Sequence, residues 1–102
     1  MYHIDWTLGA ELTYKKEIEF ILSKWSIKEV LNFIELVEDK IQTLSSGIMT
    51  GKPSKFKDVR ILVISKQTSL AYKIFEDQLR VELVTFWNNK MNPNQYDEFL
   101  EF

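Results

Sequence analysis

The spacing of apolar residues changes twice along the chain, and these changes limit the folds that the chain can adopt. Between residues 8 and 46, apolar side chains recur every three or four positions, as on one face of an α-helix. From residue 59 to residue 87 they alternate or run together, as in β-strands. A short alternating segment at 2–6 precedes the helical part. The order β-α-α-β-β-β predicts an α+β fold in one domain spanning 1–102.

A capping motif divides the helical part into two helices. Ser26 precedes Glu29 by three residues in the segment SIKE, so its hydroxyl can accept a hydrogen bond from the Glu29 amide at a helix start. We therefore expect helices at 8–25 and 26–46, with Gly47 as the C-terminal cap of the second. Because almost no loop separates them, they should form an antiparallel hairpin. The expected apolar stripes are Tyr14, Ile18, Ile21, Leu22 and Trp25 on the first helix and Val30, Phe33, Ile34, Val37, Ile41 and Leu44 on the second.

Three strands are expected after the helices, at 59–65, 68–76 and 80–87, following a loop at 47–58. They form an antiparallel meander, and the strand at 2–6 pairs at an edge of this small, mainly antiparallel sheet. The helical hairpin packs on one sheet face. The segment 59–65 is β-branched and apolar, so we expect it to be buried on both faces. Apolar and aromatic residues remain for the second sheet face, which predicts that a partner chain covers it.

Composition excludes several kinds of site. The chain has no cysteine and one histidine, which excludes disulfides, thiolate metal sites and a histidine-rich metal site, and no cofactor or metal is expected. No apolar run approaches the roughly 20 residues that span a bilayer. The N-terminal residues lack the layout of a signal peptide. We therefore expect a cytoplasmic protein that does not contact membranes.

The chain has a net charge of −2, but its middle segment is basic. Residues 52–90 carry eight Lys or Arg and four Asp or Glu, whereas 1–51 and 91–102 each have a net charge of −3. This distribution predicts a local surface that faces an anion or an acidic partner, and a mixed charged surface without such a role is the alternative. The excess is too small to indicate a dedicated nucleic-acid-binding protein.

Three segments together carry a family resemblance. They are KWSIKEVLNFIELVEDKIQTL, VRILVISKQTSLAYKI and VTFWNNKMNPN, in this order, within residues 4 to 95. The chain thereby resembles the RelE/ParE toxins of bacterial type II toxin–antitoxin (plasmid stabilisation) systems. The resemblance implies the β-α-α-β-β-β order argued above and a cognate antitoxin whose C-terminal segment wraps the toxin and neutralises it.

The resemblance leaves the activity open. RelE-like members are ribosome-dependent mRNA endonucleases, ParE-like members act on DNA gyrase, and a degenerate, non-toxic interaction module is the third alternative. Ser69 stands where ribonuclease members carry a catalytic cation, which favours a protein target such as gyrase over cleavage. The candidate catalytic residues of a ribonuclease would be Lys52, Lys55, Lys57, Arg60, Lys73, Lys90 and Tyr96.

Four residues are candidates for contact with a target or antitoxin: Arg60, Lys73, Phe75 and Trp87. Lys73 lies in mid-strand, where a cation needs a carboxylate or solvent, so it could pair with Glu82 or with an acidic antitoxin residue. Trp87 could be either core or an interface anchor. Tyr72, on an alternating strand, is expected in the core.

Overall fold

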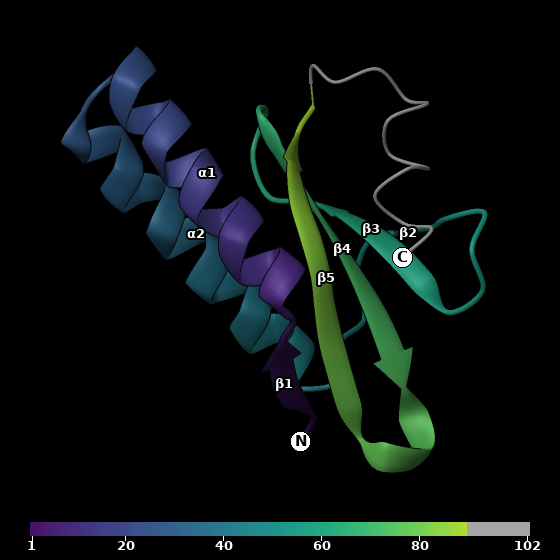
Figure 1. Ribbon diagram of the computed structural model, residues 1–102. Coiled ribbons are helices and arrows are strands. Elements are labelled where there is room, and N and C mark those ends of the chain that lie inside the picture. The colour runs from purple at the N-terminus through teal and green to yellow at the C-terminus, as the bar shows by residue number, and fades with distance from the viewer. Residues whose placement is uncertain (90–102) are drawn as a thin grey trace.

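The computed structural model describes residues 1–89, and two helices lie together beside a sheet (Figure 1). The helices are α1 (Leu8–Lys24) and α2 (Ile27–Ser45). The strands are β1 (His3–Trp6), β2 (Lys52–Pro53), β3 (Val59–Val63), β4 (Thr68–Phe75) and β5 (Arg80–Asn88), with a 3-10 turn, η1, at Glu76–Gln78. The predicted α+β fold is confirmed, with element ends one or two residues from those expected.

The sheet is mixed and has the strand order β1-β5-β4-β3-β2. The pairs β3–β4 and β4–β5 are antiparallel, as the meander predicts, and the pair β2–β3 is antiparallel as well. The strand β1 pairs in parallel with β5, with Ile4 opposite Val81, and so it forms an edge as expected. The register between β4 and β5 shifts between Ala71 and Tyr72, an irregularity of the kind that a β-bulge produces.

Local side-chain contacts fix the helix ends. The hydroxyl of Ser26 accepts a hydrogen bond from the Glu29 amide at 3.4 Å, which confirms the predicted start of α2. Thr7 caps α1 in the same way, through the Ala10 amide at 3.1 Å. At the end of α2, Gly47 adopts a φ of +96° and its amide donates to the Leu44 carbonyl, as expected for a glycine that terminates a helix.

The main core lies between the helices and one face of the sheet. Its buried apolar side chains come from α1, α2 and strands β3 to β5, and Trp6 stacks on Phe86 with ring centroids 5.7 Å apart. For two residues of the apolar stripe expected on the first helix, the expected burial is wrong: Leu22 is 50% exposed and Trp25 is 48% exposed. The reason is that α1 buries Ala10, Glu17 and Ile21, so its contact stripe is rotated away from Leu22, while Trp25 already lies beyond the helix end.

The region around β3 also differs from expectation. The loop expected at 47–58 contains β2, which pairs Lys52 with Ile61. Val63 is 60% exposed, so β3 is not buried on both faces. The cause is its place next to the sheet edge, where a two-residue neighbour covers only part of it. Gly51 permits this pairing, because its φ is +104° and a Cβ there would lie 2.5 Å from the Ile61 carbonyl oxygen.

Candidate functional site

Strand alternation sorts the candidate residues between the two sheet faces. On β4, Leu70 and Tyr72 belong to the core under the helices, whereas Ala71 belongs to a second cluster on the opposite side. We call this opposite side the far face. Lys73 and Phe75 follow Ala71 in the alternation and therefore lie on the far face. Arg60 is directly opposite Tyr72 in the register and shares the helix-covered face. The structure therefore separates Arg60 from Lys73.

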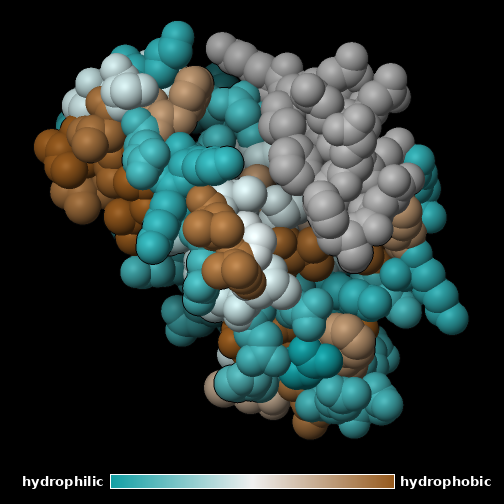
Figure 2. Space-filling model, viewed as in Figure 1, coloured by the Kyte–Doolittle hydropathy of each residue, from teal (hydrophilic) through white to brown (hydrophobic). Residues whose placement is uncertain are grey.

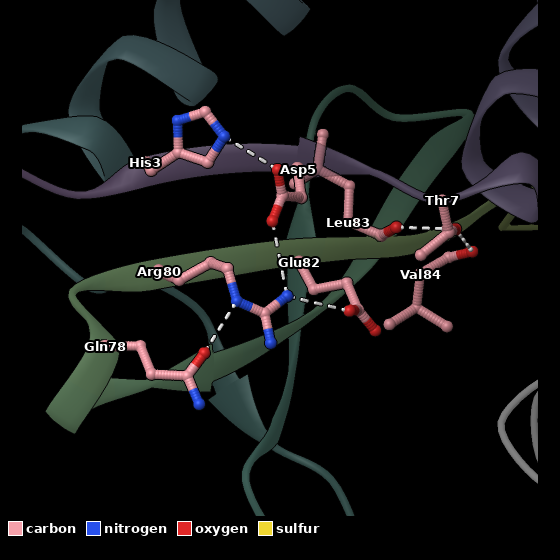
Figure 3. A network of polar contacts seen from close by, with 8 residues as sticks. All are labelled: His3, Asp5, Thr7, Gln78, Arg80, Glu82, Leu83 and Val84. Atoms are coloured by element: carbon pink, nitrogen blue, oxygen red, sulfur yellow. Dashed lines mark hydrogen bonds and ion pairs between the residues drawn. The ribbon is translucent and has the colours of Figure 1, made fainter.

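An ionic network occupies the far face where β1 meets β5 (Figure 3). The Arg80 guanidinium lies 3.3 Å from a carboxylate oxygen of Asp5 and 3.0 Å from one of Glu82. His3 lies 2.8 Å from the other Asp5 oxygen. The guanidinium carbon of Arg80 is also 4.0 Å from the ring centroid of Phe75. Arg80 thus links the acidic pair to the aromatic ring on β4.

Lys73 lies beside this network. It is directly opposite Glu82 in the strand register, but the Glu82 carboxylate binds Arg80. No ion pair within residues 1–89 joins Lys73 to Glu82, so the first of the two alternatives for Lys73 is wrong. The Lys73 ammonium instead lies 5.2 Å from the Phe75 ring centroid, in a cation–π arrangement. Phe75 is therefore flanked by two cations, and the Lys73 charge remains available to an acidic partner.

Further lysines lie on the segment that leads into β3. Lys52 is in β2, and Lys55 lies 5.5 Å from the ring centroid of Phe56. Lys57 and Arg60 line a cleft of about 640 Å³ at the end of the β3–β4 pair, together with Phe75 from the far face and acidic residues of η1. Lys73 does not line this cleft. The candidate cations are therefore spread over a loop, a cleft and two sheet faces.

Ser69 has a structural role. Its side chain is buried, and its hydroxyl donates a hydrogen bond to the side-chain oxygen of Asn89. The Asn89 amide in turn donates to the backbone carbonyls of Ser65 and Lys66, at 3.2 and 3.1 Å. These bonds hold the β3–β4 turn against the end of β5. The hydroxyl of Ser69 is neutral and supplies no charge, and its hydrogen bond to Asn89 gives it a structural role.

Tyr72 and Trp87 are both buried. Tyr72 is fully buried, as predicted, and its hydroxyl donates to the Thr50 carbonyl. Burial raises the pKa of Tyr72, although the Arg60 charge opposes this, so the phenol is neutral. Trp87 is 2% exposed and packs with Val59 and Ala71 in the cluster of the far face. Of the four proposed contact residues, Lys73 and Phe75 share the part of the far face beside Arg80. Lys90 and Tyr96 lie outside the described residues.

One buried polar residue was not predicted. Glu17 is 8% exposed, and one of its carboxylate oxygens accepts a hydrogen bond of 2.6 Å from the Thr68 hydroxyl. Burial raises the pKa of Glu17, and the bond from Thr68 partly offsets this. The signal was present in the sequence, since Glu17 follows Tyr14 by three residues and precedes Ile21 by four.

Neither a metal-binding cluster nor a membrane-spanning helix occurs within the described residues. No group of three or more His, Cys, Asp or Glu in this part of the chain could hold a metal ion. None of the helices there is both long enough and apolar enough to cross a membrane.

Solved structures share this fold, although no protein-family model and no curated protein matches the sequence. A chain of the chromosomal ParDE TA system from P. aeruginosa has a TM-score of 0.70 and 14% identity, over 86% of this chain and 96% of that one. A metal-bound toxin from Helicobacter pylori has a TM-score of 0.64 and 14% identity, over 87% and 96%. The isolated E. coli RelE toxin has a TM-score of 0.60 and 13% identity, over 96% and 95%. At these identities, the likeness shows the fold.

Proposed function

We propose that this chain, which has the fold of RelE- and ParE-type toxins, is the toxin of a toxin–antitoxin pair. It inhibits growth by binding a protein target such as DNA gyrase, and a cognate antitoxin neutralises it. The observation that carries this proposal is the likeness to the ParDE and RelE structures, which extends over most of both chains.

The distribution of charge supports protein binding over RNA cleavage. Cleavage without a metal needs a base, an acid and cations that converge on one phosphate. Arg60 and Lys73 lie on opposite sheet faces, and Ser69 is held in a structural hydrogen bond. Within residues 1–89, these candidates do not converge on one point. A binding surface, in contrast, needs only a local match in shape and charge.

The far face offers such a match. Phe75 presents an aromatic surface between Lys73 and Arg80, and Lys73 carries a charge that Glu82 does not neutralise. An acidic residue next to an apolar anchor would complement this arrangement. The C-terminal segment of the antitoxin is the partner that we place here.

Expression in a bacterial host tests the proposal. The chain is induced alone and together with the product of the neighbouring reading frame, and growth is followed. Growth arrest by the chain alone, relieved by the neighbour, is the expected outcome. Normal growth after confirmed expression of folded protein would contradict a toxin.

The target is tested separately with purified components. We expect the chain to inhibit DNA supercoiling by gyrase, or to trap cleaved DNA on it. Mapping of RNA ends in arrested cells is the matched assay for the alternative. New ends at translated codons, with gyrase unaffected, would replace the gyrase proposal by a ribosome-dependent mRNA endonuclease.

A further inference from the structure

An apolar patch lies on the outer side of the helical hairpin, near the turn between α1 and α2. It consists of Leu22, Ile27 and Leu31, which are 50%, 62% and 60% exposed, and we call it the hairpin patch. Figure 2 shows hydrophobic atoms gathered over this end of the helices. Single exposed apolar residues are common, but Ile27 and Leu31 lie one turn apart on the same face of α2, and exposed apolar residues gathered in this way indicate a contact.

Two side chains of opposite charge, Lys28 and Glu35, lie on either side of Leu31 along α2. Lys28 precedes Leu31 by three residues and Glu35 follows it by four, on a helix that spans Ile27–Ser45. Because they are seven residues apart, about two helical turns, Lys28 and Glu35 point to nearly the same side. Both are exposed, and neither takes part in an ion pair within the described part of the chain.

We infer that the hairpin patch binds a second copy of this chain, with the two α2 helices antiparallel about a twofold axis near Leu31. In that arrangement Leu31 packs on its counterpart. At about 1.5 Å per residue, Lys28 lies about 4.5 Å before the axis and Glu35 about 6 Å after it. Each Lys28 therefore comes opposite the Glu35 of the partner copy, and the contact forms twice because a twofold interface is isologous.

The charges near the patch disfavour other occupants. Glu19, Glu35 and Glu38 are exposed on the two helices, so an anionic membrane surface would be repelled. Lys24 and Lys28 lie on the same end of the hairpin, so the surface has no strong net sign that would select a highly charged partner. Along α2, Lys28 comes before Leu31 and Glu35 comes after it, so an antiparallel second copy brings opposite charges together. This surface therefore fits its own copy best.

The far face stays open in this dimer, because the helices and the far face lie on opposite sides of the sheet. The inference is therefore independent of the proposed target and antitoxin. If the chain is toxic but monomeric, the dimer is overturned and the toxin proposal stands. If the chain is dimeric but not toxic, the toxin proposal is overturned and the dimer stands.

Sedimentation equilibrium of the purified full chain over a range of concentrations tests the inference. We expect a reversible monomer–dimer equilibrium. Glu35→Lys alone and Lys28→Glu alone should each raise the dimer dissociation constant about tenfold, because every change places like charges together at two symmetric positions. The double variant with both changes should restore dissociation to within about twofold of the original chain.

Glu76→Lys is the matched control, since it makes the same charge change on η1, away from the helices, and should leave the equilibrium unchanged. Leu31→Asp should leave only monomer, and circular dichroism confirms that its fold is kept. Monomer at every concentration, a dimer that ignores the single reversals, or a double variant without rescue would each overturn the inference. So would binding to anionic vesicles in place of self-association.

Discussion

Glu17 shows how one buried carboxyl group couples the fold to pH. It lies on the contact stripe of α1 and is hydrogen-bonded to Thr68 at the start of β4. Burial raises its pKa above the ordinary value of 4.5, so the folded chain binds its proton more tightly than the unfolded chain does. The contribution of Glu17 to the free energy of unfolding therefore falls as pH rises from 4.5 through the raised pKa. Above that range the ionised carboxylate destabilises the folded chain.

We predict that Glu17→Gln removes this dependence. Below pH 4.5 both chains carry a neutral group at this position, so their free energies of unfolding should differ by a constant amount. Above it, the free energy of unfolding of the variant should rise relative to that of the original chain, by about 1.4 kcal/mol for each unit by which the pKa of Glu17 is raised. Urea unfolding at a series of pH values measures the difference. Glu19→Gln, at an exposed position on the same helix, is the control and should show no such gain.

Lys73 carries the second prediction at this scale. Lys73→Ala removes the charge that remains available on the far face, so we expect antitoxin binding to weaken about tenfold, mainly through faster dissociation. Lys66→Ala removes an equal charge from the exposed β3–β4 turn and should have little effect. Titration calorimetry with the antitoxin measures both. Equal losses in the two variants would show that net charge, and not the Lys73 site, determines binding.

The helix and strand elements differ in how far the sequence predicts them. Ser26 and Gly47 mark the ends of α2 through chemistry that acts within a few residues, and both predictions hold. The strand β2 has two residues, too few to show a period, and it forms only because Gly51 lets the chain approach β3. The separation of Arg60 from Lys73 likewise depends on register between strands, which no local pattern contains.

Gly51 can be tested as the condition for β2. Gly51→Ala forces an L-residue to a φ of +104° and places a Cβ 2.5 Å from the Ile61 carbonyl oxygen, so backbone must shift. We expect a loss of stability of about 2 kcal/mol and faster hydrogen exchange in β2 and β3. Gly47→Ala has a similar φ of +96° but meets only ring atoms of Tyr2, at 3.6 Å or more, and should cost less. Equal losses of stability in the two variants would mean that the positive φ alone, and not the contact with Ile61, determines the cost of the substitution.

At the scale of the whole molecule, the order of the elements and the helix-covered core follow from the sequence, whereas the position of the charges does not. Residues 52–90 concentrate positive charge, as the sequence shows, but the fold distributes it over β2, a cleft and the far face. Long-range attraction depends on this total charge more than on its detailed placement, whereas a catalytic site needs placement. The same charges can therefore guide an acidic partner without forming a ribonuclease site.

The salt dependence of antitoxin association tests this view. If the basic segment attracts an acidic antitoxin segment before contact, the association rate should fall about tenfold or more between low and physiological ionic strength. The dissociation rate should change far less, because short-range packing at Phe75 and its neighbours holds the complex. Stopped-flow or surface-binding kinetics at several salt concentrations separate the two rates. An association rate that is independent of salt would assign recognition to apolar contact alone, and the basic segment would then have no part in steering the partner.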